Sequence, residues 1–115
     1  MFETLRHRII WLTPGMGLLR HTVLLRFKPG TTDDQVQAVL DGLATMPGKM
    51  NFIRRYEFGR DVGIMEGNPH VALVADFDSA EDWRRYQNQP DHQRLVKEVI
   101  GPILESMTRV QYELD

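Results

Sequence analysis

The chain has 115 residues, no cysteine and a formal net charge of −2, with 42% hydrophobic and 26% charged residues. This length allows one domain with a modest core. The lack of cysteine excludes disulfides, thiolate catalysis and cysteine metal sites, and it fits a reducing compartment, so we expect a cytoplasmic protein. The slight negative charge argues against nucleic acid or an anionic membrane surface as a partner. No apolar run approaches the roughly 20 residues that a membrane span needs.

The first fifteen residues are basic and have no long apolar stretch. Their apolar run, residues 9–12, is too short for the core of a signal peptide, and Pro14-Gly15 ends the segment. We interpret 1–15 as a mobile N-terminal extension ahead of a domain over 16–115. Two alternatives stay open: translation from Met16, or a short ordered arm that packs Trp11 on a partner.

Four segments have the alternating, β-rich pattern of strands. They are residues 18–28, 51–60, 70–77 and 106–114. Alternation in the first places one set of side chains on a single face: His21, Val23, Leu25 and Phe27. The glycine-rich segment 61–69 is expected to be a loop.

Two further segments are typical of helices. The first covers 32–46, where Thr32 and Gln35 have the spacing of a capping box and Pro47-Gly48 is expected to end the helix. The second begins after Ser79, a good N-cap. Pro90 interrupts it, and Asp91 is the expected cap of the continuation towards residue 100.

The order β-α-β-β-α-β indicates an α+β fold of the ferredoxin-like kind, with a four-stranded antiparallel sheet and both helices on one face. The other face would then be bare. The alternating residues of the two central strands can be assigned to the faces in two ways. In one assignment the uncovered face carries Val23, Leu25, Phe27, Ala72 and Val74. The opposite grouping leaves Leu24, Val71, Leu73 and Phe77 bare. Either patch is larger than monomers usually expose, so we expect a homodimer of face-to-face sheets. A monomer covered by a ligand or a tail is the alternative.

Several motifs support a family resemblance. They are His21-Thr22-Val23-Leu24-Leu25-Arg26-Phe27-Lys28, Tyr56-Glu57-Phe58-Gly59-Arg60-Asp61-Val62, Ala75-Asp76-Phe77-Asp78-Ser79, and Tyr86 followed by Pro90-Asp91-His92. With these the chain resembles the stress-response A/B barrel (Dabb) domain family of the dimeric α+β barrel superfamily. The family commonly has His-Pro where this chain has Gln89-Pro90, so one histidine is missing and His92 remains.

The resemblance implies a dimeric barrel, in a family where many members have no known reaction. It also implies two candidate residues, because a plant member that acts as a polyketide cyclase uses a Tyr and a His that match Tyr86 and His92. Related barrel families include cofactor-free monooxygenases. Our first hypothesis is a homodimer with a small-molecule-binding cavity whose catalysis is not established, and the alternative is an enzyme of one of these two kinds. A purely structural or regulatory protein is the third possibility.

His92 and Tyr86 are the candidate catalytic residues. With an unperturbed pKa near 6.5, a histidine can take a proton from a carbon between two carbonyls, and Tyr86 could hydrogen-bond the resulting enolate. The alternative is that Pro90-Asp91-His92 only shapes the helix junction. The expected residues of an apolar ligand site are His21, Val23, Phe27, Tyr56 and Val74.

The remaining histidines indicate structure more than chemistry. His21 is expected to be a hydrogen-bonded core residue with Asp76 or Tyr56 as its partner, and His70 is expected to be exposed. The histidines lie far apart and form no His-x₃-His pattern or facial triad, so we predict no metal site. Without a P-loop or a dinucleotide glycine pattern, we also predict no cofactor.

Overall fold

The structure is a computed structural model that describes residues 17–114; the predicted extension over 1–15 lies outside the described residues. The strands are β1 (Leu19–Phe27), β2 (Ile53–Arg60), β3 (Val71–Phe77) and β4 (Leu104–Glu113). The helices are α2 (Asp33–Ala44), α3 (Met46–Lys49), α4 (Ala80–Asn88) and α5 (Pro90–Leu95). A π-helical turn η1 (Val96–Ile100) and a 3₁₀ turn η2 (Gly101–Ile103) continue α5 into β4.

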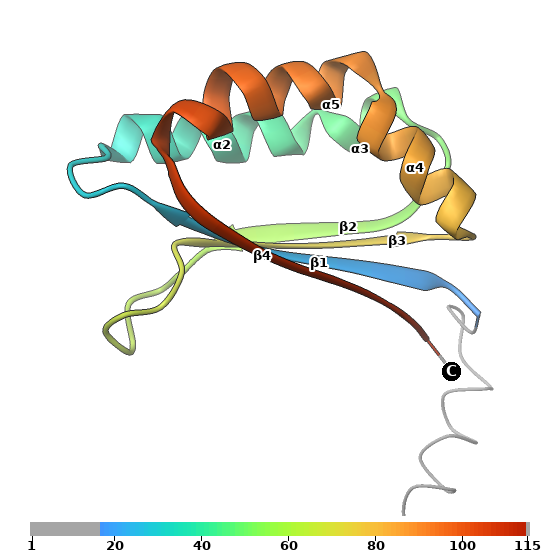
Figure 1. Ribbon diagram of the computed structural model, residues 1–115, viewed down its shortest axis with the longest axis horizontal. Coiled ribbons are helices and arrows are strands. Elements are labelled where there is room, and N and C mark those ends of the chain that lie inside the picture. Colours follow the sequence, from blue (N-terminus) through green and yellow to red (C-terminus); the bar gives the residue numbers. More distant parts are fainter. Residues whose placement is uncertain (1–16, 115) are drawn as a thin grey trace, which may run out of the picture.

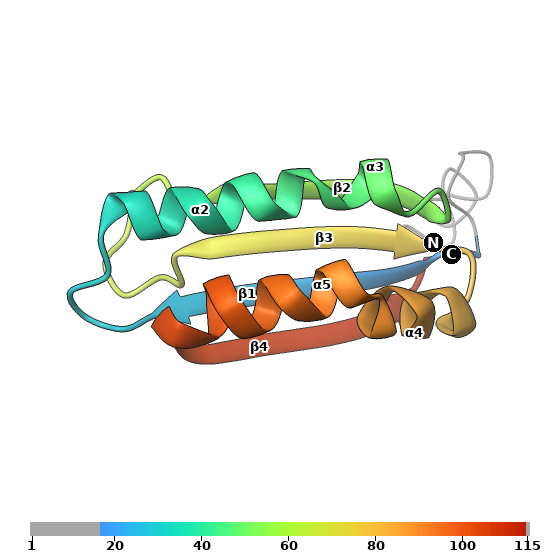
Figure 2. The same cartoon turned by 90° about the horizontal axis from the view of Figure 1, so that it is seen from above.

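The four strands form one antiparallel sheet in the order β2-β3-β1-β4. All the helices lie on one face of it (Figure 1), which confirms the expected ferredoxin-like α+β fold. Seen from above, α2 runs along the β2 and β3 side while α4 and α5 lie over the β1 and β4 side (Figure 2). Within the described range no helix combines the length and the apolar character that crossing a bilayer requires.

The helix starts follow the sequence signals, with two corrections. The Thr32 hydroxyl accepts from the Gln35 N–H while the Gln35 side chain accepts from the Thr32 N–H, which confirms the capping box. Ser79 caps α4 as expected. Pro47 does not end the helical region: α2 ends at Ala44, and the proline lies in the first turn of α3, where its missing N–H costs nothing.

The second correction concerns the junction that carries His92. Gln89, not Asp91, caps α5, because its side-chain Oε1 accepts from the backbone N–H groups of Asp91 at 2.6 Å and His92 at 3.1 Å. Pro90 occupies the first turn. The cap fixes the angle at which α5 leaves α4, and so fixes the direction of the His92 side chain.

The expected grouping of residues across the central strands was wrong by one residue. Val23 is paired with Leu73, and Thr22 with Val74. Directly opposed residues point to the same side of a sheet, so Val74 lies on the face opposite Val23. Alternation fixes the faces within one strand but not the register between two strands, and a shift of one residue exchanges the faces.

The helix-covered face of the sheet carries the core. Val23, Leu25, Leu73 and Phe77 are buried against Val36, Val39, Leu43, Tyr86 and Ile100 from the helices. Each Å² of apolar surface removed from water stabilises the fold by about 25 cal/mol, so burial of this set supplies most of the driving force for folding. A second set of polar residues lies within the same layer and forms the candidate site.

The open face of the sheet is mixed instead of continuously apolar. Leu24 and Val74 are half-buried at its centre, and Val110 and Tyr112 on β4 are 53% and 46% exposed. Asp76 is buried on this face under Arg20, which binds it through two hydrogen bonds of 2.8 and 2.9 Å. The Arg20–Asp76 pair therefore interrupts the apolar surface of this face.

Candidate functional site

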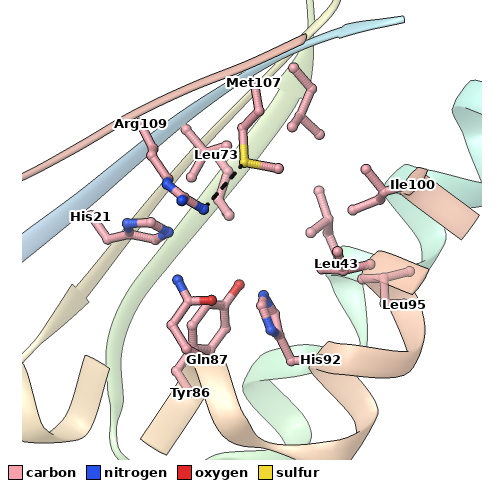
Figure 3. A pocket seen from close by; sticks show the side chains of 13 residues that line it. His21, Leu43, Leu73, Tyr86, Gln87, His92, Leu95, Ile100, Met107 and Arg109 are labelled. Atoms are coloured by element: carbon pink, nitrogen blue, oxygen red, sulfur yellow. Dashed lines mark hydrogen bonds between the residues drawn. The ribbon is translucent and has the colours of Figure 1, made fainter. Parts of the chain in front are cut away.

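A cavity of about 90 Å³ lies between the covered face of the sheet and the helices α2, α4 and α5 (Figure 3). Most of its lining is apolar: Val23, Leu25, Leu43, Leu73, Leu95, Val96, Ile100 and Met107. Its polar lining is His21, Tyr86, Gln87, His92 and Arg109. None of the described residues that line it is an Asp or a Glu. An apolar chamber with a few convergent polar groups is the usual form of a small-molecule site.

His21 projects from β1 onto the covered face and is 2% exposed. Its Nδ1 accepts a hydrogen bond of 2.9 Å from the Gln111 side-chain amide, so the proton of the neutral ring is on Nε2. Burial, and then the charges of His92 and Arg109, lower the pKa of His21 to about 4. His21 is thus a neutral hydrogen-bonded core histidine, but its partner is Gln111, not the expected Asp76 or Tyr56.

Tyr86 is fully buried on α4 at the floor of the cavity. Its hydroxyl lies 2.8 Å from the Tyr56 hydroxyl of β2. Burial raises the pKa of both phenols, that of Tyr86 to about 12, and the bond from Tyr56 limits the rise for Tyr86. Tyr86 is therefore a neutral hydrogen-bonding group at physiological pH, and Tyr56 holds it in place from behind.

His92 follows the Gln89 cap and turns its ring towards the cavity (Figure 3). The ring lies against Tyr86, with a centroid separation of 4.2 Å. Burial lowers the pKa of His92, and a backbone hydrogen-bonding contact with Gln87 opposes part of that shift. Its Nδ1 is fully buried and makes no hydrogen bond of good geometry within the described residues.

Arg109 extends from β4 towards the cavity (Figure 3) and is exposed, so it lies where the lining meets solvent, at the mouth of the cavity. It is paired with Val23 across the sheet, so it shares the covered side, and β4 is an edge strand. Its closest polar contact in the described part of the chain is the Met107 sulfur, at 3.9 Å. The site therefore combines two histidines of lowered pKa, a neutral tyrosine and one cation.

The structure brings together four of the residues that the sequence singled out, namely His21, Val23, Tyr86 and His92. Tyr56 lies one step behind, bonded to Tyr86. The two others lie elsewhere. Phe27 stacks on His70 at 5.5 Å outside the cavity, and Val74 is on the opposite face of the sheet.

His70 was wrongly expected to be exposed. It is half-buried, and its Nδ1 accepts a hydrogen bond of 2.9 Å from the Phe27 N–H. This histidine is therefore satisfied within the fold and supports the end of β1.

The sequence reasoning missed Gln87, Met107 and Arg109 as lining residues. A signal was present, because Met107, Arg109 and Gln111 alternate on the last strand. The register against β1 decides whether that set faces the helices or the open side, and the sequence did not supply it. Among residues 17–114, no cluster of three or more His, Cys, Asp or Glu could hold a metal ion.

Comparison with known proteins agrees with this architecture. The stress-response A/B barrel domain-containing protein HS1 of Arabidopsis thaliana is 23% identical over 90 residues, which cover 76% of this chain and 82% of that protein. A dimeric ferredoxin-like protein of unknown function from Thermobifida fusca is 35% identical, with a TM-score of 0.80 over 90% of this chain and 96% of that one.

A hydroxynitrile lyase from Passiflora edulis has the same fold. It is 19% identical with a TM-score of 0.74, over 89% of this chain and 96% of that one. The family model of the stress responsive A/B barrel domain matches residues 19–114, the whole of the sheet and helix layers described above. This chain therefore belongs to the stress responsive A/B barrel domain family.

Proposed function

We propose that this protein is a homodimer that binds a small, largely apolar molecule in the cavity between its sheet and helices. The observation that carries the proposal is the apolar chamber on which His21, Tyr86 and His92 converge. An enclosed apolar cavity with a few convergent polar groups is the usual form of a small-molecule site. The lack of cysteine supports a cytoplasmic location for such a binder.

Two observations support the homodimer. The Thermobifida fusca relative, at 35% identity, is described as dimeric. The open face of the sheet leaves Val110 and Tyr112 about half exposed beside Leu24 and Val74. A two-fold dimer would cover this face with its own copy. Sedimentation of the purified chain tests it: a species of twice the 13.4 kDa chain mass is expected, and a stable 13.4 kDa species would contradict it.

Ligand binding is tested by thermal shift with a panel of small phenols, carboxylic acids and short polyketide-like molecules. At a ligand concentration of 100 Kd, binding adds about 2.7 kcal/mol to the free energy of unfolding and raises the Tm by several degrees. The matched variant is Val96→Trp, which fills the chamber from its lining. We expect the variant to lose the shift, and a shift of equal size in both proteins would place the ligand elsewhere.

The second candidate function is proton-transfer catalysis of the polyketide-cyclase or cofactor-free monooxygenase kind. The specific support is the contact of His92 with Tyr86, whose ring centroids are 4.2 Å apart. A neutral His92 would accept the proton of an acidic C–H next to a carbonyl. The Tyr86 hydroxyl would hydrogen-bond the enolate oxygen that forms, and Tyr56 would keep that hydroxyl in place.

This candidate predicts that His92→Ala lowers turnover of a poly-β-keto thioester or a quinol about 10²–10⁴-fold while the protein still folds. Tyr86→Phe should lower it less, because it removes one hydrogen bond to the developing oxyanion. His70→Gln is the control, since His70 lies outside the cavity. Wild-type protein that leaves both substrates unchanged would remove this candidate and leave the binding function in place.

A further inference from the structure

Arg109 differs from most arginines of the described chain in having no carboxylate partner there. Six others form ion pairs with Asp or Glu side chains: Arg20, Arg54, Arg55, Arg60, Arg85 and Arg94. Arg109 is also the one charged residue among those that line the cavity. A cation at the mouth of an apolar chamber with no acid in its lining is complementary to an anion.

The groups that face Arg109 across the cavity are neutral or donate hydrogen bonds. His21 has its proton on Nε2 because Nδ1 accepts from Gln111. The Gln87 amide lies on the opposite wall, next to Tyr86 and His92 (Figure 3). No negative group of the lining would repel an anion. The electrostatic preference of the chamber is therefore set by the guanidinium alone.

We propose that the ligand of this cavity is a small carboxylic acid, with its carboxylate on Arg109 at the mouth and its hydrocarbon part among the apolar residues within. The inference rests on the proposed binding function and deepens it by naming the ligand class. A guanidinium presents two parallel N–H groups that match a carboxylate, and such charged pairs are stronger than neutral hydrogen bonds.

The volume of the chamber limits the length of the carboxylic acid that can bind. An engineered cavity of about 150 Å³ holds one benzene molecule, and this cavity measures about 90 Å³. With the carboxylate outside at the mouth, the chamber suits a hydrocarbon part of about three to four carbons.

The test is isothermal titration calorimetry on the full chain at neutral pH. The ligands are the straight-chain carboxylates from butanoate to octanoate, together with the primary amide and the alcohol that correspond to each acid. An amide matches the acid in shape and lacks its charge. We expect the best acid to bind at least tenfold more tightly than its amide. Arg109→Gln should reduce the acid to the affinity of the amide, and Arg109→Lys should keep part of the preference.

Arg84→Gln is the matched control, because Arg84 is exposed on α4 and does not line the cavity. The control should bind like the unsubstituted protein. Equal affinity for acid and amide, or an acid preference that survives Arg109→Gln, would overturn the inference and leave the proposed binding function standing. If no acid, amide or alcohol bound, the inference and the binding function would both fall.

Discussion

The two faces of the sheet differ in how their arginines are paired. On the open face, Arg20 binds the buried carboxylate of Asp76 through two hydrogen bonds. On the covered face, Arg109 lines the cavity and forms no ion pair within the described part of the chain. A paired charge stabilises the fold, whereas an unpaired charge beside a cavity is available to a ligand of opposite charge. This difference, more than burial itself, separates structure from site in this protein.

The histidines repeat the same contrast on a smaller scale. His70 accepts the N–H of Phe27 and stacks on its ring, so its environment is complete. His21 is held by Gln111 on one side and faces the cavity with the other. His92 has the least complete environment of the three. We therefore expect substitutions on the open face to affect stability alone, and substitutions on the covered face to affect ligand binding as well as stability.

A large stability effect is expected on the open face. Asp76→Asn keeps the shape of the side chain and removes its charge, which leaves Arg20 without its ionic partner. We expect a loss of about 2 kcal/mol in the free energy of unfolding, measured by urea denaturation. Asp78→Asn is the control, because the Arg54–Asp78 pair is exposed to solvent and is expected to contribute much less. Equal losses would break the contrast between engaged and exposed carboxylates.

The covered face predicts an acid-sensitive fold. The pKa of His21 is about 4 in the folded chain and 6.5 unfolded, so the unfolded state binds more protons between these values. Stability is therefore complete above pH 6.5 and is lost as the pH falls towards 4. The pKa shift alone corresponds to a loss of roughly 3 kcal/mol in the free energy of unfolding. Because solvent near the cavity screens the charge, we expect a measured loss of about 2 kcal/mol.

Urea unfolding at a fixed protein concentration across this pH range measures the effect. The lowered pKa of His92 contributes to the same loss, in the same direction. In His21→Gln the free energy of unfolding should change less steeply with pH, because the variant lacks the proton that His21 takes up on unfolding. A dependence that is unchanged in this variant would mean that His21 is not the neutral, buried group described above.

The packing of α2 against α5 is expected to affect the cavity. Gly42 on α2 lies against Leu95, and a Cβ at this position would overlap the Leu95 side chain. Leu95 lines the cavity, so Gly42→Ala should push it into the chamber and weaken ligand binding about tenfold. The stability change should stay within about 1 kcal/mol, because the better helix propensity of alanine offsets part of the crowding.

Titration of the best small acid, amide or alcohol into Gly42→Ala checks this result. Gly48→Ala is the control, because nothing lies within 4 Å of a Cβ at that position. Unchanged affinity in Gly42→Ala would show that the ligand does not occupy the space beside Leu95.

The sequence was sufficient for the parts of the fold that local patterns determine. Capping signals placed α2 and α4, and alternation put His21 and Val23 on one face of β1. It was not sufficient for Val74, whose face depends on the register between β1 and β3. The same register decides that Arg109 joins the cavity, so its role could not be found from one strand alone.

Side-chain partners were harder to predict than elements. Gln111 is 90 residues from His21 in the chain, and only the pairing of β4 with β1 brings the two together. Asp is intrinsically a better N-cap residue than Gln, which favoured Asp91 as the cap of α5. Gln89 caps the helix instead, because its long side chain reaches past the proline to two backbone N–H groups. Both cases depend on geometry that follows from folding and not from residue type.

The most direct test of the central claim is an NMR titration of the histidine rings with pentanoate and, separately, with pentanamide. If the covered-face cavity is the ligand site, the ring signals of His21 and His92 should move with whichever molecule binds, and the signals of His70 should stay in place. Movement of His70 alone, or binding that leaves all three rings unchanged, would contradict the account.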